Sequence, residues 1–151
     1  MSLSIENLSK ENIEDVILLH AKNKWVSIPK NVWNVHLRVY SRFCFVAKKE
    51  NAVVGYILAL NQRYFDISLF VDISHRRQGI AKKLLLKCVS SVYKTNNQDI
   101  VVSAKILVSN PAVNLFKMFG FVVNLQENDT YLLLRQRHAK IDIPKDFFIE
   151  N

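Results

Sequence analysis

The chain has 151 residues, half of them apolar, and carries 21 Lys and Arg against 13 Asp and Glu, for a formal net charge of +8. This length supports one hydrophobic core, so we expect a single domain over residues 1–151, with 139–151 as an ordered arm or a loose tail. The apolar runs are far shorter than the roughly 20 residues of a membrane span, and the positive charge favours an anionic partner.

The first half of the chain predicts two helices and four strands. Alternation of apolar and polar residues predicts a short strand over 3–7, and helical spacing of apolar residues predicts helices over 13–20 and about 30–41. His20 and His36 lie on the apolar faces of these helices, where buried histidines are expected. Short connections predict an antiparallel meander of three further strands. These strands cover about 43–49, 52–62 and 64–72.

The second half predicts a helical crossover. An apolar stripe over 80–92 predicts a packed amphipathic helix, and the buried strand after it, 100–108, should run parallel to 64–72. A helix then starts near Pro111 and ends before Gly120, and two short strands close the chain, over about 121–126 and 130–136. The fold class is therefore α/β of the α+β kind, with a mostly antiparallel sheet of about six to seven strands, one parallel pair and about four helices.

A cationic turn precedes the helix that begins near Gly79. Backbone N–H groups at a helix N-terminus have no helical partner and attract anions, so residues 77–81 predict a phosphate cradle. Gly79 lets the backbone approach a ligand or adopt a positive φ, and Ala81 keeps the first helical turn narrow. Taken alone, such a segment is more often a solvated turn. The cations around it are Arg76, Arg77, Lys82 and Lys83.

Two motifs occur in a recognisable order. The turn matches the pattern Arg/Gln-x-x-Gly-x-Gly/Ala through Arg76, Gly79 and Ala81, and the later stretch NPAVNLFKMFGF has an asparagine, an alanine and an aromatic residue on a helix that ends in Gly-Phe. With the same order of elements from about residue 3 to 137, the chain resembles the GNAT acetyltransferase superfamily. The resemblance implies a GNAT-like fold in which the parallel strands splay apart.

The resemblance also implies a cofactor and a reaction. Acetyl-CoA would bind at the turn, and its acetyl group would pass to a primary amine of a small molecule or peptide. Asn110 would contact the pantetheine arm or simply cap its helix. The backbone N–H of Val71 would donate to the thioester oxygen. The other residues that the resemblance assigns to the cofactor are Leu69, Phe70, Arg76, Arg77, Gln78, Gly79, Ile80, Ala81 and Phe116.

The catalytic acid and base are harder to assign. Phe116 stands where many members have a tyrosine that protonates the leaving thiolate, and the positions of the family's glutamates correspond to Phe65 and Lys105. Asp66 is the candidate base, although strand alternation places its side chain on the opposite face from Val71 unless a β-bulge intervenes, and an ordinary exposed aspartate is the favoured interpretation. Without a strong base, either an α-amine with a pKa of ~8 is favoured over a lysine-like amine with a pKa of ~10.4, or a base acts through a water molecule.

Two other functions stay open. One is a CoA-binding regulator without catalysis, which Phe116 favours. The other is a nucleic-acid-binding module, but the positive residues are spread along the chain, which argues against it. Cys44 and Cys88 are expected to be buried, and the histidines and cysteines show no metal-ligand spacing, so no metal site is expected. The acidic N-terminal stretch is unlike a secretory signal, so a cytoplasmic location is expected. The acceptor is unknown, and a homodimer stays open.

Overall fold

A computed structural model of the chain describes residues 2–22, 28–61, 65–95, 101–107, 110–126 and 131–137. The predicted arm over 139–151 lies outside these residues. The strands are β1 (Leu3–Asn7), β2 (Phe45–Lys49), β3 (Ala52–Asn61), β4 (Phe65–Val71), β5 (Val101–Leu107), β6 (Val122–Gln126) and β7 (Tyr131–Arg137). The helices are α1 (Ile13–His20), α2 (Lys30–Arg38), α3 (Ile80–Thr95) and α4 (Ala112–Met118).

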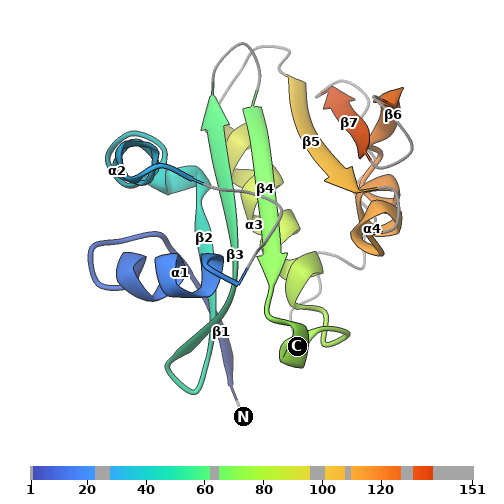
Figure 1. Cartoon of the computed structure of the whole chain (residues 1–151). Coiled ribbons are helices and arrows are strands. Elements are labelled where there is room, and N and C mark those ends of the chain that lie inside the picture. Colours follow the sequence, from blue (N-terminus) through green and yellow to red (C-terminus); the bar gives the residue numbers. More distant parts are fainter. Residues whose placement is uncertain are drawn as a thin grey trace.

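The seven strands form one sheet in the order β1-β2-β3-β4-β5-β7-β6, with helices on both faces (Figure 1). Along β3, Tyr56 and Leu58 pack under α1 and α2, whereas Ile57 and Ala59 pack under α3. Successive residues of a strand point to opposite faces, so a central strand covered on both sides must be apolar throughout. This explains why β3 reads as a continuous apolar run.

The predicted topology is confirmed. β2, β3 and β4 form the antiparallel meander, and β4 pairs with β5 in parallel across the α3 crossover. The parallel pairing covers only three rungs, of which the last joins Ile67 to Ala104. β4 continues to Val71 and β5 to Leu107, so the two strands separate beyond this rung, as the splayed pair requires.

The second helix is shorter than predicted. α2 ends at Arg38, and a 3-10 turn over Ser41–Phe43 comes before β2, which begins at Phe45 rather than at 43. The backbone N–H of Phe43 donates to the Tyr40 carbonyl at 2.8 Å, which takes the chain out of both helix and strand. Phe43 packs edge-on against Phe65, with 5.1 Å between the ring centres, so it is buried although it lies outside the strand. Its hydrophobicity therefore led to a predicted start of β2 that is two residues too early.

Gly55 allows α3 to approach the sheet closely. A β-carbon at this position would lie 3.1 Å from the Phe70 carbonyl oxygen and 3.3 Å from side-chain atoms of Leu84 and Val71. Gly55 is also paired with Val71 in the β3–β4 ladder, so the contacting backbone has little freedom to move away. The space between β3, β4 and α3 at this position therefore favours a residue without a side chain.

We predict that Gly55→Ala lowers the free energy of unfolding by about 1–3 kcal/mol, because a methyl group must be forced into a packed interface. Denaturant titration followed by circular dichroism measures this change. Alanine in an open strand position would instead raise stability by up to about 1 kcal/mol, so a gain would contradict the proposed close approach.

His36 gives the stability of α2 a dependence on pH. Its side chain is buried, and its Nδ1–H donates to the Val32 carbonyl at 2.9 Å. Burial lowers the pKa of His36 below its ordinary value of 6.5, and the hydrogen bond to Val32 opposes part of that shift. The folded chain therefore binds a proton at this ring less readily than the unfolded chain does.

We predict that the free energy of unfolding decreases as the pH falls below about 6.5, because the unfolded state then binds more protons. His36→Gln should flatten this decrease while leaving the slope above pH 8 unchanged. Thermal melts from pH 5 to pH 8.5 measure both slopes, and parallel curves for the two proteins would show that another group is responsible.

Candidate functional site

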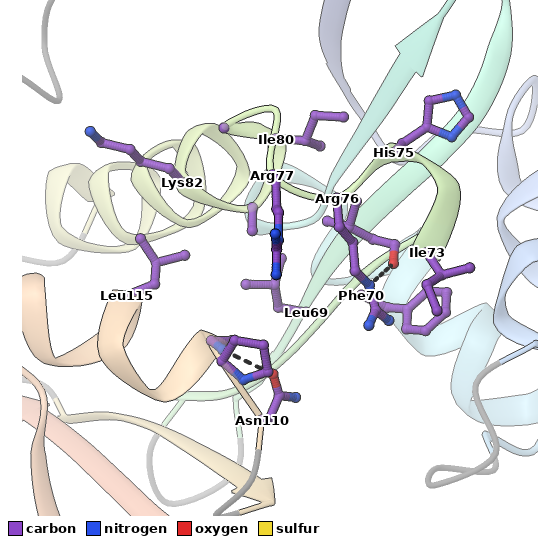
Figure 2. A pocket seen from close by; sticks show the side chains of 15 residues that line it. Leu69, Phe70, Ile73, His75, Arg76, Arg77, Ile80, Lys82, Asn110 and Leu115 are labelled. Atoms are coloured by element: carbon purple, nitrogen blue, oxygen red, sulfur yellow. Dashed lines mark hydrogen bonds between the residues drawn. The ribbon is translucent and has the colours of Figure 1, made fainter.

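A cleft of about 610 Å³ lies between the end of β4, the start of α3 and the start of α4 (Figure 2). Its lining joins segments that are about 40 residues apart in the sequence, from Leu69 to Asn110. Most of the predicted cofactor residues come together here. Those that line the cleft are Leu69, Phe70, Val71, Arg76, Arg77, Gly79, Ile80, Ala81 and Asn110.

The edge of β4 offers backbone groups to this cleft. The N–H of Asp72 donates to the Val54 carbonyl at 2.8 Å, on the β3 side. Backbone groups of alternate residues along a strand point to opposite edges, so the N–H and C=O of Leu69 and Val71 point towards the gap beside β5. Leu69, which the resemblance assigns to the cofactor, is thus a second backbone donor beside Val71.

The turn between β4 and α3 contributes further backbone to the lining of the cleft. Arg77 and Gly79 both have positive φ angles, of 65° and 78°. The Gly79 carbonyl accepts the N–H of Lys83 at 3.2 Å, so the N–H groups of Gly79, Ile80 and Ala81 precede the first bond of the helix. The predicted positive φ at Gly79 is confirmed.

The charge of the cleft is positive. Arg76, Arg77 and Lys82 contribute to its lining, and none of the described residues that line it is acidic. The N-terminus of α3 adds the positive end of a 16-residue helix. Backbone N–H donors together with guanidinium and ammonium groups are the donor set that a diphosphate requires.

Asn110 both caps its helix and lies at the cleft, so its two predicted roles are compatible. Its Oδ1 accepts the N–H of Ala112 at 2.9 Å, and its carbonyl accepts the N–H of Val113 at 3.1 Å, so it caps the start of α4. The residue is nevertheless exposed and lines the cleft. Because the cap uses only oxygen atoms, the amide nitrogen can donate to a ligand.

Three predicted residues lie apart from the cleft lining. Phe116 is 1% exposed and packs edge-on against Phe121 at 5.0 Å, so its ring belongs to the core. The side chain of Gln78 turns away to Lys49, whose Nζ donates to it at 2.7 Å. Asp66 is half-buried on β4 and accepts a 2.6 Å hydrogen bond from the hydroxyl of Ser103, its partner on β5.

The cleft also contains residues that the sequence did not indicate. Ile73 and His75 belong to the 3-10 turn (Ile73–His75) that follows β4, and Leu115 lies one turn into α4. Ile73 is 76% exposed, which is unusual for an isoleucine beside a charged turn. Such an isolated apolar residue was the only sequence signal, and it is too common to be decisive.

The two cysteines are unsuited to nucleophilic chemistry. Burial raises the pKa of Cys44 to about 12 and that of Cys88 well above its ordinary value. Both thiols are free and buried, as predicted. A thiol of this kind stays protonated at neutral pH and is a poor nucleophile.

Comparisons with known proteins identify the family. The family description "Acetyltransferase (GNAT) domain" matches residues 7–131, which is most of the chain. The chain belongs to the GNAT acetyltransferase family. An N-alpha-acetyltransferase of Sulfurisphaera tokodaii is 26% identical over 134 residues, which cover 78% of each protein.

Solved structures show the same fold. Arabidopsis thaliana Naa50, in complex with the bisubstrate analogue CoA-Ac-MVNAL, superimposes with a TM-score of 0.75 at 16% identity, over 90% of this chain and 99% of that one. The diaminobutyrate acetyltransferase of Paenibacillus lautus, in complex with its substrate and coenzyme A, gives a TM-score of 0.69 at 16% identity, over 99% and 98% of the two chains.

This GNAT protein is therefore an N-acetyltransferase that transfers an acetyl group from acetyl-CoA to an amine. The predicted family, fold, reaction and cofactor are confirmed, and acetyl transfer is favoured over the alternative of a regulator without catalysis. Among the helices that the structure describes, none combines the length and the apolar character that crossing a bilayer requires.

Proposed function

We propose that this acetyltransferase acts on the α-amine of a peptide or protein N-terminus. The proposal rests chiefly on the likeness to proteins named N-alpha-acetyltransferase. An α-amine has a pKa of about 7.7–8.0, so about a fifth to a third of it is neutral at pH 7.4, and it needs much less help from a base than a lysine amine with a pKa of about 10.4. We also propose the cytoplasm as its location, in keeping with the two free thiols.

Peptides that differ only in their amines test the acceptor. Thiol release from acetyl-CoA should be fast with a free N-terminus and slow with an acetylated N-terminus and a free lysine. Diaminobutyric acid serves as a small-molecule comparison, because a diaminobutyrate acetyltransferase shares the fold. Faster turnover of the small diamine than of every peptide would contradict the proposal.

For the cofactor, we propose that the turn and the edge of β4 bind its two ends. The N–H groups from Arg77 to Ala81 would hold the diphosphate, assisted by the positive charge of Arg77 and Lys82. The pantetheine arm would lie along Leu69, Phe70 and Val71 like an added strand, and Asn110, which precedes α4, would donate to it. The Val71 N–H would then donate to the thioester oxygen as negative charge develops on it.

For the base, we propose Asp66. Its carboxylate is directed by the Ser103 hydroxyl at 2.6 Å, one rung before the strands separate. Asp66 pairs with Leu60 across the β3–β4 ladder and shares the α1 and α2 face of the sheet with Phe70. An amine that approaches the gap from this face would meet the carboxylate directly or through one water.

We predict that Gly79→Glu abolishes the rise in melting temperature that acetyl-CoA causes, while the protein remains folded. A β-carbon at Gly79 meets no atom within 4 Å, so the new side chain has room. Its carboxylate, however, would face the diphosphate among the N–H donors. Thermal melts with and without acetyl-CoA measure the effect.

Gly79→Ala is the matched control for this variant. Alanine carries the same cost of a positive φ, about 1–2 kcal/mol, without the charge. It should melt earlier than the wild type yet retain a clear shift with acetyl-CoA. A full ligand-induced shift in Gly79→Glu would place the diphosphate elsewhere.

We predict that Asp66→Asn lowers kcat/KM for a peptide amine by about 5- to 10-fold at pH 7, because only about a tenth to a sixth of an α-amine with a pKa of about 7.7–8.0 is neutral at this pH without a base. The loss should shrink above pH 9, where the α-amine is already neutral. Ser68→Ala, two residues along the same face, serves as the control and should keep the wild-type rate. A loss that is constant with pH would assign Asp66 a structural role.

A further inference from the structure

The side chain of Arg76 contacts other residues of the protein instead of extending into the cleft. Its Nε donates a hydrogen bond to the Val71 carbonyl at 3.0 Å, and its guanidinium carbon lies 5.7 Å from the centre of the Phe70 ring. Figure 2 shows this side chain folded back along the end of β4, whereas Arg77 extends into the cleft. The two neighbouring arginines are therefore directed to different partners.

The hydrogen bond from Arg76 holds the second end of the peptide group between Val71 and Asp72. The peptide between Val71 and Asp72 is the last before the chain leaves the sheet, and its N–H donates to the Val54 carbonyl at 2.8 Å. Its C=O, on the opposite edge, is held by Arg76. With both ends bonded, the plane of this peptide cannot rotate, and the turn leaves β4 in a defined direction.

The carbonyl also matters for the charge of the cleft. The C=O of Val71 points towards the gap, where an oxygen with free lone pairs would repel an anion. Because the Nε–H of Arg76 donates to this oxygen, the end of β4 presents hydrogen-bond donors to the cleft instead of a free acceptor. Stacking on Phe70 keeps the guanidinium over β4.

We propose that Arg76 is a positioning residue, which holds the last peptide of β4 and covers its carbonyl, and that Arg77 and Lys82 supply the positive charge at the diphosphate. This inference rests on the proposed cofactor site at the turn. It predicts that the hydrogen bond of Arg76 matters more for acetyl-CoA binding than the charge of Arg76 does.

Two substitutions separate the bond from the charge. The donating atom, Nε, is attached to Cδ. Glutamine has an amide nitrogen attached to Cδ, so it places an uncharged N–H donor at the same covalent position. Lysine keeps the charge but has a methylene group there, and its ammonium lies one bond farther out.

Calorimetric titration of acetyl-CoA at low and high salt tests the proposal. Arg76→Gln should bind within about threefold of the wild type, whereas Arg76→Lys and Arg76→Ala should each bind about tenfold more weakly, as expected for loss of a hydrogen bond from a charged donor. Arg77→Gln is the matched control. It should lose affinity mainly at low salt, because screening already weakens its charge at high salt.

The order of the Arg76 variants decides the result. If Arg76→Lys binds as well as or better than Arg76→Gln, Arg76 acts through its charge and the proposal is overturned. Melts without ligand accompany each titration to show that every variant is folded at the temperature of the titration, since Arg76→Lys and Arg76→Ala lose a hydrogen bond of the free protein. If Gly79→Glu binds normally, the cofactor site itself is wrong; if it does not bind while the order is reversed, only the role of Arg76 is wrong.

Discussion

The separation of β4 from β5 after three parallel rungs is the constraint on which the site depends. Backbone N–H and C=O groups inside a protein need partners, and the gap leaves those of Leu69 and Val71 directed at no neighbouring strand in the part of the chain described. One of them, the Val71 carbonyl, is bonded by Arg76. The remaining groups are suited to an extended, amide-containing ligand.

The core fixes the geometry of this gap. α3 buries Leu84, Leu85 and Cys88 against the sheet, which positions its N-terminus at the end of β4. Gly55 permits this close contact, since any side chain there would push against Phe70 and Val71. The positive end of the helix and the edge of the strand thus meet at one place because of apolar packing.

The proposed oxyanion donor and the proposed base lie at different places on the sheet. The side chain of Val71 is buried on the α3 face, while its N–H lies in the plane of the sheet. Asp66 lies on the opposite face, with Phe70. A donor in the sheet plane and a base on one face are compatible, so the opposite direction of their side chains, which counted against Asp66 in the sequence, is no obstacle to the proposed reaction.

Much of the architecture could be predicted from residue patterns, because alternation and helical spacing report burial directly. The double-sided apolar run of β3 and the stripe of α3 are examples. Patterns failed where an apolar residue packs outside regular structure, as Phe43 does in its 3-10 turn. The positive φ at position 79 was predictable, because this backbone conformation suits glycine. The bond from Arg76 to Val71 was not, because nothing in the sequence distinguishes its direction from that of Arg77.

The most direct measurement compares acetyl-CoA with acetyl-pantetheine, which retains the thioester and the amide arm but lacks the diphosphate and nucleotide. If the turn after β4 holds the diphosphate, acetyl-CoA should bind at least about a hundredfold more tightly, and raising the salt concentration should narrow the difference. Equal affinities, or a difference that salt leaves unchanged, would contradict the account.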